Sequence, residues 1–477
     1  MRIVSLRLPA AILLSCVFAA FGQNAPPVQP ESLESLRGQM QELKFLVEEM
    51  RKQLTDSRGE TDSLRREVQA LRQQVQNPPP PSPDLADDQR LLAAKVADQS
   101  QTKVGSGSRY QVELSGMALM NGFTTRGAVD NLDLPETARA VAPGESGGST
   151  GATLRQSTIG LSVTGPQWGG AKTSGEIKFD FFGGFPITSE GVTSGLVRLR
   201  TAKINFDWKN TSIVAGQDAL FFSPLSPTSL VSAAYPSLAS AGNLWTWTPQ
   251  VYVERRMALG QHSHLSLQGG VLDPLTGELP RDEYDRQPTA GERSRMPAYA
   301  ARIAVQNDST DRPRAFGVGS YYSRQNWGFG RTVDAWAATA DWNLPLGRWF
   351  AVSGEFYRGR SLGGLGGGAT GGMVFTASGA LLPVESLGGW SQVKFKPSER
   401  WQFNAAFGKD GSFGDRLERG PLPSGLVRRN ASGLFNVIFQ PRGNLLFSLE
   451  YRRLWTSRFF ERIAIADHFG MGVAILF

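Results

Sequence analysis

The last ten residues of the chain, His468–Phe477, alternate between large apolar side chains and mostly small or polar ones. The large apolar positions are Phe469, Met471, Val473, Ile475 and Phe477. A period of two residues is that of a β-strand, in which successive side chains point to opposite faces of the sheet. About ten residues is also the length that a tilted strand needs to cross a lipid bilayer. The segment therefore predicts a membrane-spanning strand.

The same alternation recurs in about sixteen segments from Tyr110 onward. In Leu445–Trp455, for example, Phe447 and Leu449 share one face, while Ser448 lies on the other. Further clear cases are Thr173–Gly183, Ser263–Leu272, Pro297–Asn307 and Arg429–Phe439. In one more segment, 195–209, the polar positions change parity midway, which predicts a β-bulge near Thr201.

Short and long connections alternate between these segments. The short turns are Lys209–Thr211, Pro345–Arg348, Pro397–Arg400 and Pro441–Asn444, and tryptophans flank several of them. The long connections are Asn121–Thr153, Phe222–Trp247, Asp273–Met296, Gly359–Gly389 and Gly411–Arg428. A soluble β-sandwich also alternates, but short turns, long loops and boundary aromatics together are typical of outer-membrane barrels. We therefore predict an all-β transmembrane barrel of about 16 antiparallel strands over residues 110–477.

The residues before the barrel predict an export signal and an N-terminal α-helical coiled coil. Residues 1–22 place Arg2 and Arg7 before an apolar stretch, which is typical of a cleaved signal peptide. Because Leu-Leu-Ser precedes Cys16, a lipoprotein signal is the alternative. Over residues 31–77, apolar residues recur at steps of three and four through more than six heptads, which predicts a coiled coil and hence an oligomer. Residues 78–109 predict a proline-rich linker followed by a short helix.

Composition excludes several kinds of site. Lysine and arginine number 50 against 43 acidic residues, giving a net charge of +7. These charges are scattered over the strands and form no basic patch, so we do not expect nucleic-acid binding. The only cysteine, Cys16, lies in the leader, which excludes a disulfide framework and a cysteine metal site in the mature chain. We expect no cofactor and no metal.

A barrel of about sixteen strands is too wide for side chains to fill. Because unpaired charges in a dry interior would cost many kcal/mol, the charged inward positions predict a water-filled lumen. Arg198 and Arg200 lie two residues apart on one face, with Lys203 nearby, and predict a positive ladder. The pore-lining, anion-binding candidates are Arg198, Arg200, Lys203, Lys178, Arg155, Arg256, Arg302 and Arg452. Lys394 and Lys396 add to them, against Glu113, Glu176, Asp180, Asp207, Glu254, Asp341, Glu355 and Glu450.

Four short motifs in the barrel resemble the DcaP-like porins. They are LRQSTIGLSVTGP (Leu154–Pro166), GEIKFDF (Gly175–Phe181), LVRLRTA (Leu196–Ala202) and IVAGQD (Ile213–Asp218). With the export signal, coiled coil and barrel, the likeness covers nearly the whole mature chain. It implies a homotrimer, a periplasmic coiled coil and uptake of small anions such as dicarboxylates, with Arg198 and Arg200 as the paired lumen arginines. Thr201 and Ala202 are less bulky than the pair expected at these positions, which leaves the particular solute open.

The carboxy-terminal Phe477 resembles the final phenylalanine of outer-membrane barrels, which forms part of the signal read by the barrel-assembly machinery. The expected partners are therefore this machinery, outer-membrane lipid and lipopolysaccharide, and peptidoglycan through the coiled coil. Phosphate-selective porins share the plan of a stalk and a barrel and are a second resemblance. They need a dense row of lysines and arginines, which we do not find in this sequence.

The third long connection, Phe222–Trp247, is the candidate constriction, because porins commonly fold their third outer loop into the lumen. It contains no charged residue, and its aromatic residues include Tyr235, Trp245 and Trp247. If this loop folds inward, ion selectivity falls to the charges of the wall, with Asp218 at the base of the loop. The slightly positive wall then predicts a mild anion preference.

Three other motifs do not predict catalysis or metal binding. Gly144–Gly148 (GESGG) matches a serine-nucleophile motif, but His262 and His264 are predicted at the opposite end of the barrel, beyond hydrogen-bond reach. Gly366–Gly371 matches GxGxxG without the strand-turn-helix frame that gives this motif its function. His262 and His264 share a strand face but have no third ligand. We therefore expect no enzyme.

The sequence thus predicts an outer-membrane channel for passive diffusion of small hydrophilic solutes, with a mild preference for dicarboxylate-like anions. The alternative is an anchor with a plugged barrel, which links the outer membrane to the cell wall through the coiled coil.

Overall fold

In the computed structural model, the chain divides into two compact units, Met1–Ala94 and Lys95–Phe477. The structure describes residues 44, 48, 103–104 and 110–477, except 188–194, 280–284, 308, 310–311, 370, 377–378, 414–416, 418–421 and 424. Lys44 and Glu48 are helical. Apart from these two residues and β1 (Lys103–Val104), the expected signal peptide, coiled coil and linker lie outside the described residues. No helix among the described residues is long and apolar enough to cross a membrane.

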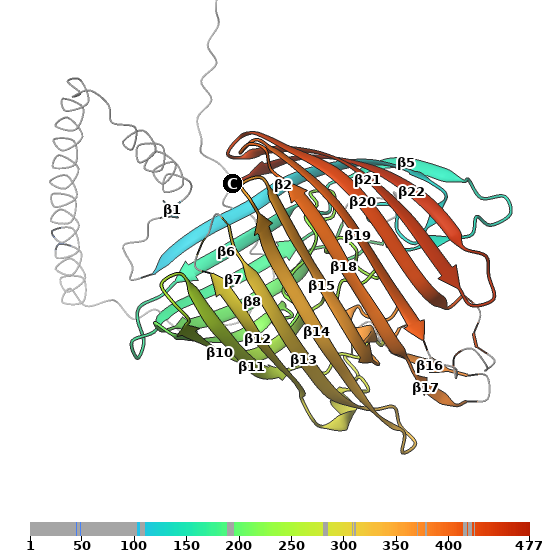
Figure 1. Ribbon diagram of the computed structural model, residues 1–477, viewed down its shortest axis with the longest axis horizontal. Helices are drawn as coiled ribbons and strands as arrows, with labels where there is room; N and C mark the ends of the chain where they lie inside the picture. The colour runs from blue at the N-terminus through green and yellow to red at the C-terminus, as the bar shows by residue number, and fades with distance from the viewer. Residues whose placement is uncertain are drawn as a thin grey trace, which may run out of the picture. The chain divides into compact units, whose positions relative to one another are not determined.

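One antiparallel sheet closes on itself to form a barrel (Figure 1). The sheet has eighteen described strands. The two-residue β1 only pairs with the first residues of β2, and β5 and β6 are two parts of one strand, so the wall contains sixteen. They are β2 (Gln111–Arg126), β5 with β6 (Gly148–Thr153 and Thr158–Thr164), β7 (Lys172–Asp180), β8 (Arg198–Asp207), β9 (Thr211–Ala219), β10 (Trp247–Ala258), β11 (Ser263–Leu272), β12 (Ala298–Asn307), β13 (Ala315–Asn326), β14 (Thr332–Leu346), β15 (Phe350–Arg360), β18 (Glu385–Phe395), β19 (Trp401–Phe413), β20 (Val427–Arg442), β21 (Leu445–Arg458) and β22 (Ala464–Leu476).

The last strand closes the barrel against the first. β22 pairs with β2 from Met117↔Leu476 to Arg126↔Asp467, and the backbone of Phe477 exchanges two further hydrogen bonds with Gly116 (2.7 and 3.1 Å). Each strand between them pairs antiparallel with its neighbours. The predicted barrel of about 16 antiparallel strands is confirmed.

The two faces of the wall have opposite character. Large apolar side chains such as Ile303, Phe435 and Met471 are exposed on the outside, whereas polar side chains such as Asn436 and Glu450 are buried on the inside. A soluble protein would show the reverse, because apolar surface is driven out of water. An apolar outer face around a polar interior is the arrangement that suits a barrel surrounded by lipid.

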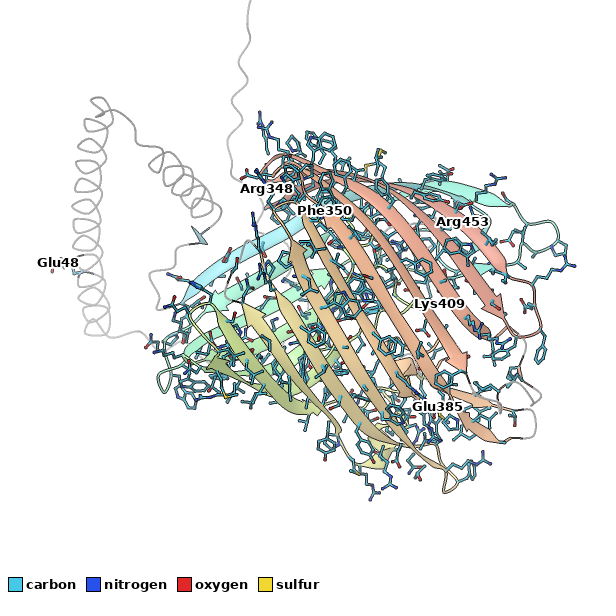
Figure 2. The ribbon with its side chains drawn as sticks, in the orientation of Figure 1. Glu48, Arg348, Phe350, Glu385, Lys409 and Arg453 are labelled. Carbon is cyan, nitrogen blue, oxygen red and sulfur yellow. The ribbon has the colours of Figure 1, made fainter. Side chains whose placement is uncertain are left out.

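The two ends of the barrel also differ. The predicted short turns join β8 to β9, β14 to β15, β18 to β19 and β20 to β21 at one end. Aromatic rings stack beside these turns, with Phe350 and Phe395 centred 4.6 Å apart and Trp401 and Phe439 4.4 Å apart. Figure 2 shows Phe350 at this end and Glu385 towards the other, where the long connections lie.

At three of the five long connections the strands extend further than the sequence indicated. The expected connection Asn121–Thr153 shortens to 127–147, because β2 and β5 continue to pair up to Arg126↔Gly148. Outside the lipid-facing band a strand can be polar on both faces, so the alternation of apolar and polar residues does not show where the strand ends. This explains the difference. Short elements lie within these connections: β3 (Ala128–Val129), β4 (Ala138–Arg139), η1 (Glu292–Ser294), η2 (Gly363–Leu365), β16 (Met373–Phe375) and β17 (Leu381–Pro383).

The predicted bulge near Thr201 is present. Thr201 pairs with Lys178 and Leu199 with Phe179, which leaves Arg200 without a partner on β7. A bulge inserts one extra residue and re-aims the side chains around it. Arg198, Arg200 and Lys203 thereby all carry side chains that form ion pairs on the inner face.

Candidate functional site in the lumen

The connection between β9 and β10, residues 220–246, lies inside the barrel, and we call it L3. It is hydrogen-bonded to inner-face side chains on widely separated strands. Asn121 of β2 donates to the carbonyl of Val231 (3.3 Å), and Thr339 of β14 donates to the carbonyl of Phe222 (2.8 Å). Most residues of L3 are buried. L3 therefore crosses the lumen, as the sequence suggested for the third long connection.

One side of L3 is sealed against the wall formed by β15, β18 and β20. The carboxylate of Glu355 accepts hydrogen bonds from the hydroxyl of Ser223 (2.9 Å) and the backbone N–H of Leu225 (2.7 Å). The backbone of Thr228 donates to Gln392 (2.7 Å) and accepts from Asn436 (2.8 Å). These wall side chains are at most 2% exposed. An uncharged loop can be buried here because the wall satisfies its backbone groups.

Two further residues fasten the middle of L3. Gln156, in the break between β5 and β6, donates to the carbonyl of Val231 (2.9 Å) and accepts from the N–H groups of Ala233 (2.8 Å) and Ala234 (3.0 Å). Arg452 forms an ion pair with Glu450 (2.7 Å) and donates to the hydroxyls of Ser232 and Ser237. Arg452 is thus a structural contact of L3.

The connection 127–147, which we call L1, also contacts L3. The hydroxyl of Ser240 donates to the carboxylate of Glu136 (2.7 Å). Burial raises the pKa of Glu136 from 4.5 to about 7, and the nearby Asp130 raises it further, while the Ser240 hydrogen bond and Arg452 act in the opposite direction. L1 and L3 therefore meet at a carboxyl group that titrates near neutral pH.

The other side of L3 faces the wall formed by β7 to β10, where charged groups stay partly exposed. Arg198 donates two hydrogen bonds to Asp180 (3.0 and 2.6 Å) and one to the carbonyl of Ala234 in L3 (3.0 Å). Arg200 lies 3.8 Å from the same carboxylate. The side chains of Arg198 and Arg200 are 24% and 21% exposed, whereas that of Asp180 is 0% exposed. The surface offered to the lumen at this point is therefore cationic.

Two aromatic residues of L3, Tyr235 and Trp245, and the first residue of β10, Trp247, surround this pair of arginines. The ring of Trp247 lies 5.0 Å from the guanidinium of Arg198 and 4.8 Å from that of Arg200. Tyr235 lies 5.4 Å from Arg198, and Trp245 is 5.2 Å from Tyr235 and 5.6 Å from Trp247. The electron-rich ring faces attract the cations. Burial raises the pKa of Tyr235 to about 12, so its hydroxyl stays neutral. We call these five residues the arginine–aromatic cluster.

Three more of the sequence-predicted cations lie on this side of the lumen. Lys203 is 2.8 Å from Asp218. Arg256 contacts Asp207 at 2.8 Å and Glu254 at 3.5 Å. Lys178 is 2.8 Å from Glu176 and is 48% exposed. The predicted positive ladder is therefore a row of ion pairs whose cationic ends remain partly exposed.

The remaining three of the eight anion-binding candidates do not line the lumen as expected, because they are buried in ion pairs. Arg302 holds Asp341 with two hydrogen bonds (2.9 and 2.6 Å), and the two side chains are 4% and 1% exposed. Arg155 pairs with Asp133 of L1 and lies 4.1 Å from the ring of Phe182. Arg452 is 3% exposed. A buried charge needs a partner of opposite sign, and each of these has one.

The sequence did not identify the residues that hold L3. Gln156, Gln392 and Asn436 occupy inward positions, and each bonds to the backbone of L3. The alternation with outward-facing apolar residues indicates that these side chains face inward. Their hydrogen-bond partners can be identified only from the path that L3 takes through the lumen.

A closed antiparallel barrel with an apolar outside, a polar inside and a loop across its lumen is the fold of the outer-membrane porins. The sequence matches no protein-family model and no curated protein. The structure is similar to that of the outer membrane channel DcaP of Acinetobacter baumannii, with a TM-score of 0.60 and 15% identity over 79% of this chain and 100% of that one. It is also similar to an anion-selective porin from Comamonas acidovorans (TM-score 0.46, 12% identity, 77% of this chain and 100% of that one). OmpT of Vibrio cholerae is a further match (TM-score 0.46, 9% identity, 79% and 100%).

Proposed function

We propose that this protein is an outer-membrane channel for the passive diffusion of small hydrophilic solutes, with a mild preference for anions. The observation that carries this proposal is the arginine–aromatic cluster. It lies on the side of L3 that faces β7 to β10, which we call the open side. Two guanidinium groups share one carboxylate, and that carboxylate is 0% exposed. A solute that passes L3 on this side therefore meets the cations and not their counter-charge.

The chemistry of this cluster suits a carboxylate solute. A guanidinium offers a planar fork of donors that matches a carboxylate, and it binds as a weakly hydrated cation. Lys203, three positions beyond Arg200 on β8, supplies a second exposed cationic group, 23% exposed beside Asp218. Two cationic points along one strand fit a small dicarboxylate better than a monocarboxylate.

The neighbouring ion pairs limit the size of this preference. Lys178, Lys203 and Arg256 each lie within 2.8 Å of a carboxylate that is itself partly exposed. Cations and anions therefore both meet opposite charges along the wall. We infer a mild anion preference, without exclusion of neutral solutes.

The wider assignment rests on the four sequence motifs and on the fold shared with DcaP. We infer a DcaP-like porin that forms a homotrimer in the outer membrane, with its coiled coil in the periplasm and without enzymatic activity. Phe477, whose backbone bonds to Gly116 beside the closing seam, is the proposed assembly signal. Peptidoglycan is the proposed partner of the coiled coil.

A swelling assay on liposomes that contain the purified protein tests the channel function. We expect uptake of a small dicarboxylate to exceed that of a diamine of equal length, with a neutral sugar of similar size in between. Replacing both arginines (R198Q/R200Q) should remove the difference between dicarboxylate and diamine while sugar uptake persists.

The tight burial of L3 favours a second candidate, a plugged barrel that serves as an anchor. Phe222 and Asn243 of L3 are 0% exposed. The same assay separates the two functions, because a plugged barrel would admit none of the three solutes.

A further inference from the structure

The outer wall of the barrel carries a groove of about 640 Å³ across β15, β18, β19 and β20. Its floor contains small residues that lie on adjacent strands, Gly389, Ser391 and Gly411, with Leu387 paired to Gly411 and Ser391 paired to Phe407. Its sides are the aromatic rings of Phe356, Phe407 and Phe413. An apolar groove on a lipid-facing wall is a place where a hydrocarbon chain can lie.

Three cations surround this groove. Strand register places Arg358, Leu387, Gly411 and Arg429 in one row across the four strands, and Lys409 lies two residues before Gly411. Lys409 and Arg429 line the groove, and the guanidinium of Arg358 lies 5.4 Å from the ring of Phe413. The side chain of Arg429 extends over Gly411, where an added Cβ would be 3.1 Å from its Cγ. We call Arg358, Lys409 and Arg429 the outer cation triad.

Among the residues that the structure describes, the outer cation triad has no counter-charge of its own. Within the described part of the chain, none of its three side chains has a carboxylate within 4.0 Å. Other arginines on the outer wall are paired: Arg324 with Asp334 (3.6 Å), Arg360 with Glu385 (3.7 Å) and Arg453 with Asp467 (3.3 Å). Exposed cations without a described partner beside an apolar groove favour an amphiphilic ligand that carries negative charge.

The position of the triad along the strands indicates which lipids it meets. Lys409 and Arg358 lie in the last third of β19 and β15, next to long connections, and Arg429 lies near the start of β20, after one. In outer-membrane barrels the long connections face outward and the short turns face the periplasm. The triad therefore lies at the outer leaflet, and Figure 2 shows Lys409 on the wall between Phe350 and Glu385.

We propose that this groove binds the phosphorylated glycolipid of the outer leaflet, with an acyl chain over Gly389 and Gly411 and phosphates on the outer cation triad. Arg358 and Arg429 are three strand spacings apart, about 14 Å. One phosphodiester headgroup cannot reach both ends of this row. A disaccharide with a phosphate at each end can, and its acyl chains fill the groove below. The assignment does not depend on which solutes cross the lumen.

Binding of purified lipopolysaccharide to the detergent-solubilised native protein, measured by native mass spectrometry, tests the proposal. We expect the variant R358Q/K409Q/R429Q to bind at least about tenfold more weakly than the native protein. The matched control R324Q/R360Q/R453Q removes three paired arginines from the same wall and should bind as the native protein does. A second variant, Gly411→Phe, keeps every charge, fills the groove floor and should also lose binding.

Unchanged conductance of the triad variant in planar bilayers establishes that its barrel is folded. Equal binding of dephosphorylated glycolipid by the native protein would overturn the proposal. Equal competition by vesicles of an anionic phospholipid would overturn it too, because a single phosphate would then suffice. If the triad variant loses its oligomeric state while it retains bound glycolipid, a second copy of the chain covers the groove and the proposal is wrong.

Discussion

The two sides of L3 differ in how the wall treats its polar groups. On the sealed side, Glu355, Gln392 and Asn436 are at most 2% exposed and each bonds to L3. On the open side, Arg198, Arg200 and Lys203 are 21% to 24% exposed, and they pair with wall carboxylates. The same inward alternation thus produces a structural contact on one side and a water-accessible charged surface on the other.

This difference shows that an inward polar residue does not by itself line a pore. A buried polar group needs a hydrogen-bond partner, and on the sealed side L3 provides it. Where L3 does not cover the wall, charges can pair with each other and keep contact with water. Selectivity should therefore depend on the open side, and the stability of the constriction on the sealed side.

The largest effect should follow from Glu450→Ala, which removes the carboxylate that pairs with Arg452 at the middle of L3, next to the sealed side. Arg452 would remain buried without a carboxylate, a loss of about 3–5 kcal/mol in pairs of this kind. The hydroxyl of Ser229 would also lose its acceptor on the wall. We expect a larger, noisier conductance and unfolding at a lower temperature, measured in planar bilayers and by heat-modified gel mobility. Glu254→Ala on the open side, where Glu254 is 18% exposed, is the matched control and should leave both unchanged.

The next effect concerns the open side, where R198Q/R200Q leaves Asp180 without its two cationic partners. One charge at about 4 Å contributes about 1 kcal/mol even in water, roughly fivefold in a permeability ratio. We expect the reversal potential in a salt gradient to move from anion towards cation preference by at least this factor. Lys178→Gln, which removes a 48% exposed cation from β7, should move it less. Equal shifts in the two variants would contradict a special role for the arginine pair.

A smaller effect should come from ionic strength. The Debye length falls from about 10 Å at 0.1 M salt to about 3 Å at 1 M, so partly exposed charges are screened. We expect the anion preference of the native protein to shrink over this range, measured as the permeability ratio at each concentration. A ratio that stays constant would place the selective charges in a region that salt cannot screen.

The smallest effect should be the pH dependence of the L1–L3 contact. Because the pKa of Glu136 is raised from 4.5 to about 7, the contact is most stable below pH 4.5 and weakens as the pH rises through 7. We expect current noise to increase over this range, and Glu136→Gln to abolish the change. Glu145→Gln is the control, since the pKa of Glu145, held near 2 by its hydrogen bonds from Arg139, lies outside the range.

Much of the fold could be predicted from the sequence because a lipid-facing barrel imposes alternation on each strand. The strand faces, the short turns and the bulge near Thr201 all follow from local pattern. The bulge was visible because polar residues change parity between Arg200 and Lys203, and no other local structure explains such a change.

The partners of the charged residues could not be predicted in the same way. Asp133 and Arg155 meet only because L1 folds back into the lumen, and Arg302 on β12 meets Asp341 on β14 across one intervening strand, β13. Such contacts depend on the register between strands and on the path of the loops, and the alternation of apolar and polar residues determines neither. The five residues of the arginine–aromatic cluster were all named from the sequence, but their mutual contact depends on how L3 returns to β10.

The most direct test of the account is the single-channel current of the native protein in a planar bilayer under a salt gradient. We expect discrete conductance steps and a reversal potential that favours anions mildly. Stable insertion without current would contradict an open passage beside L3, and a reversal potential that favours cations would contradict the role assigned to Arg198 and Arg200.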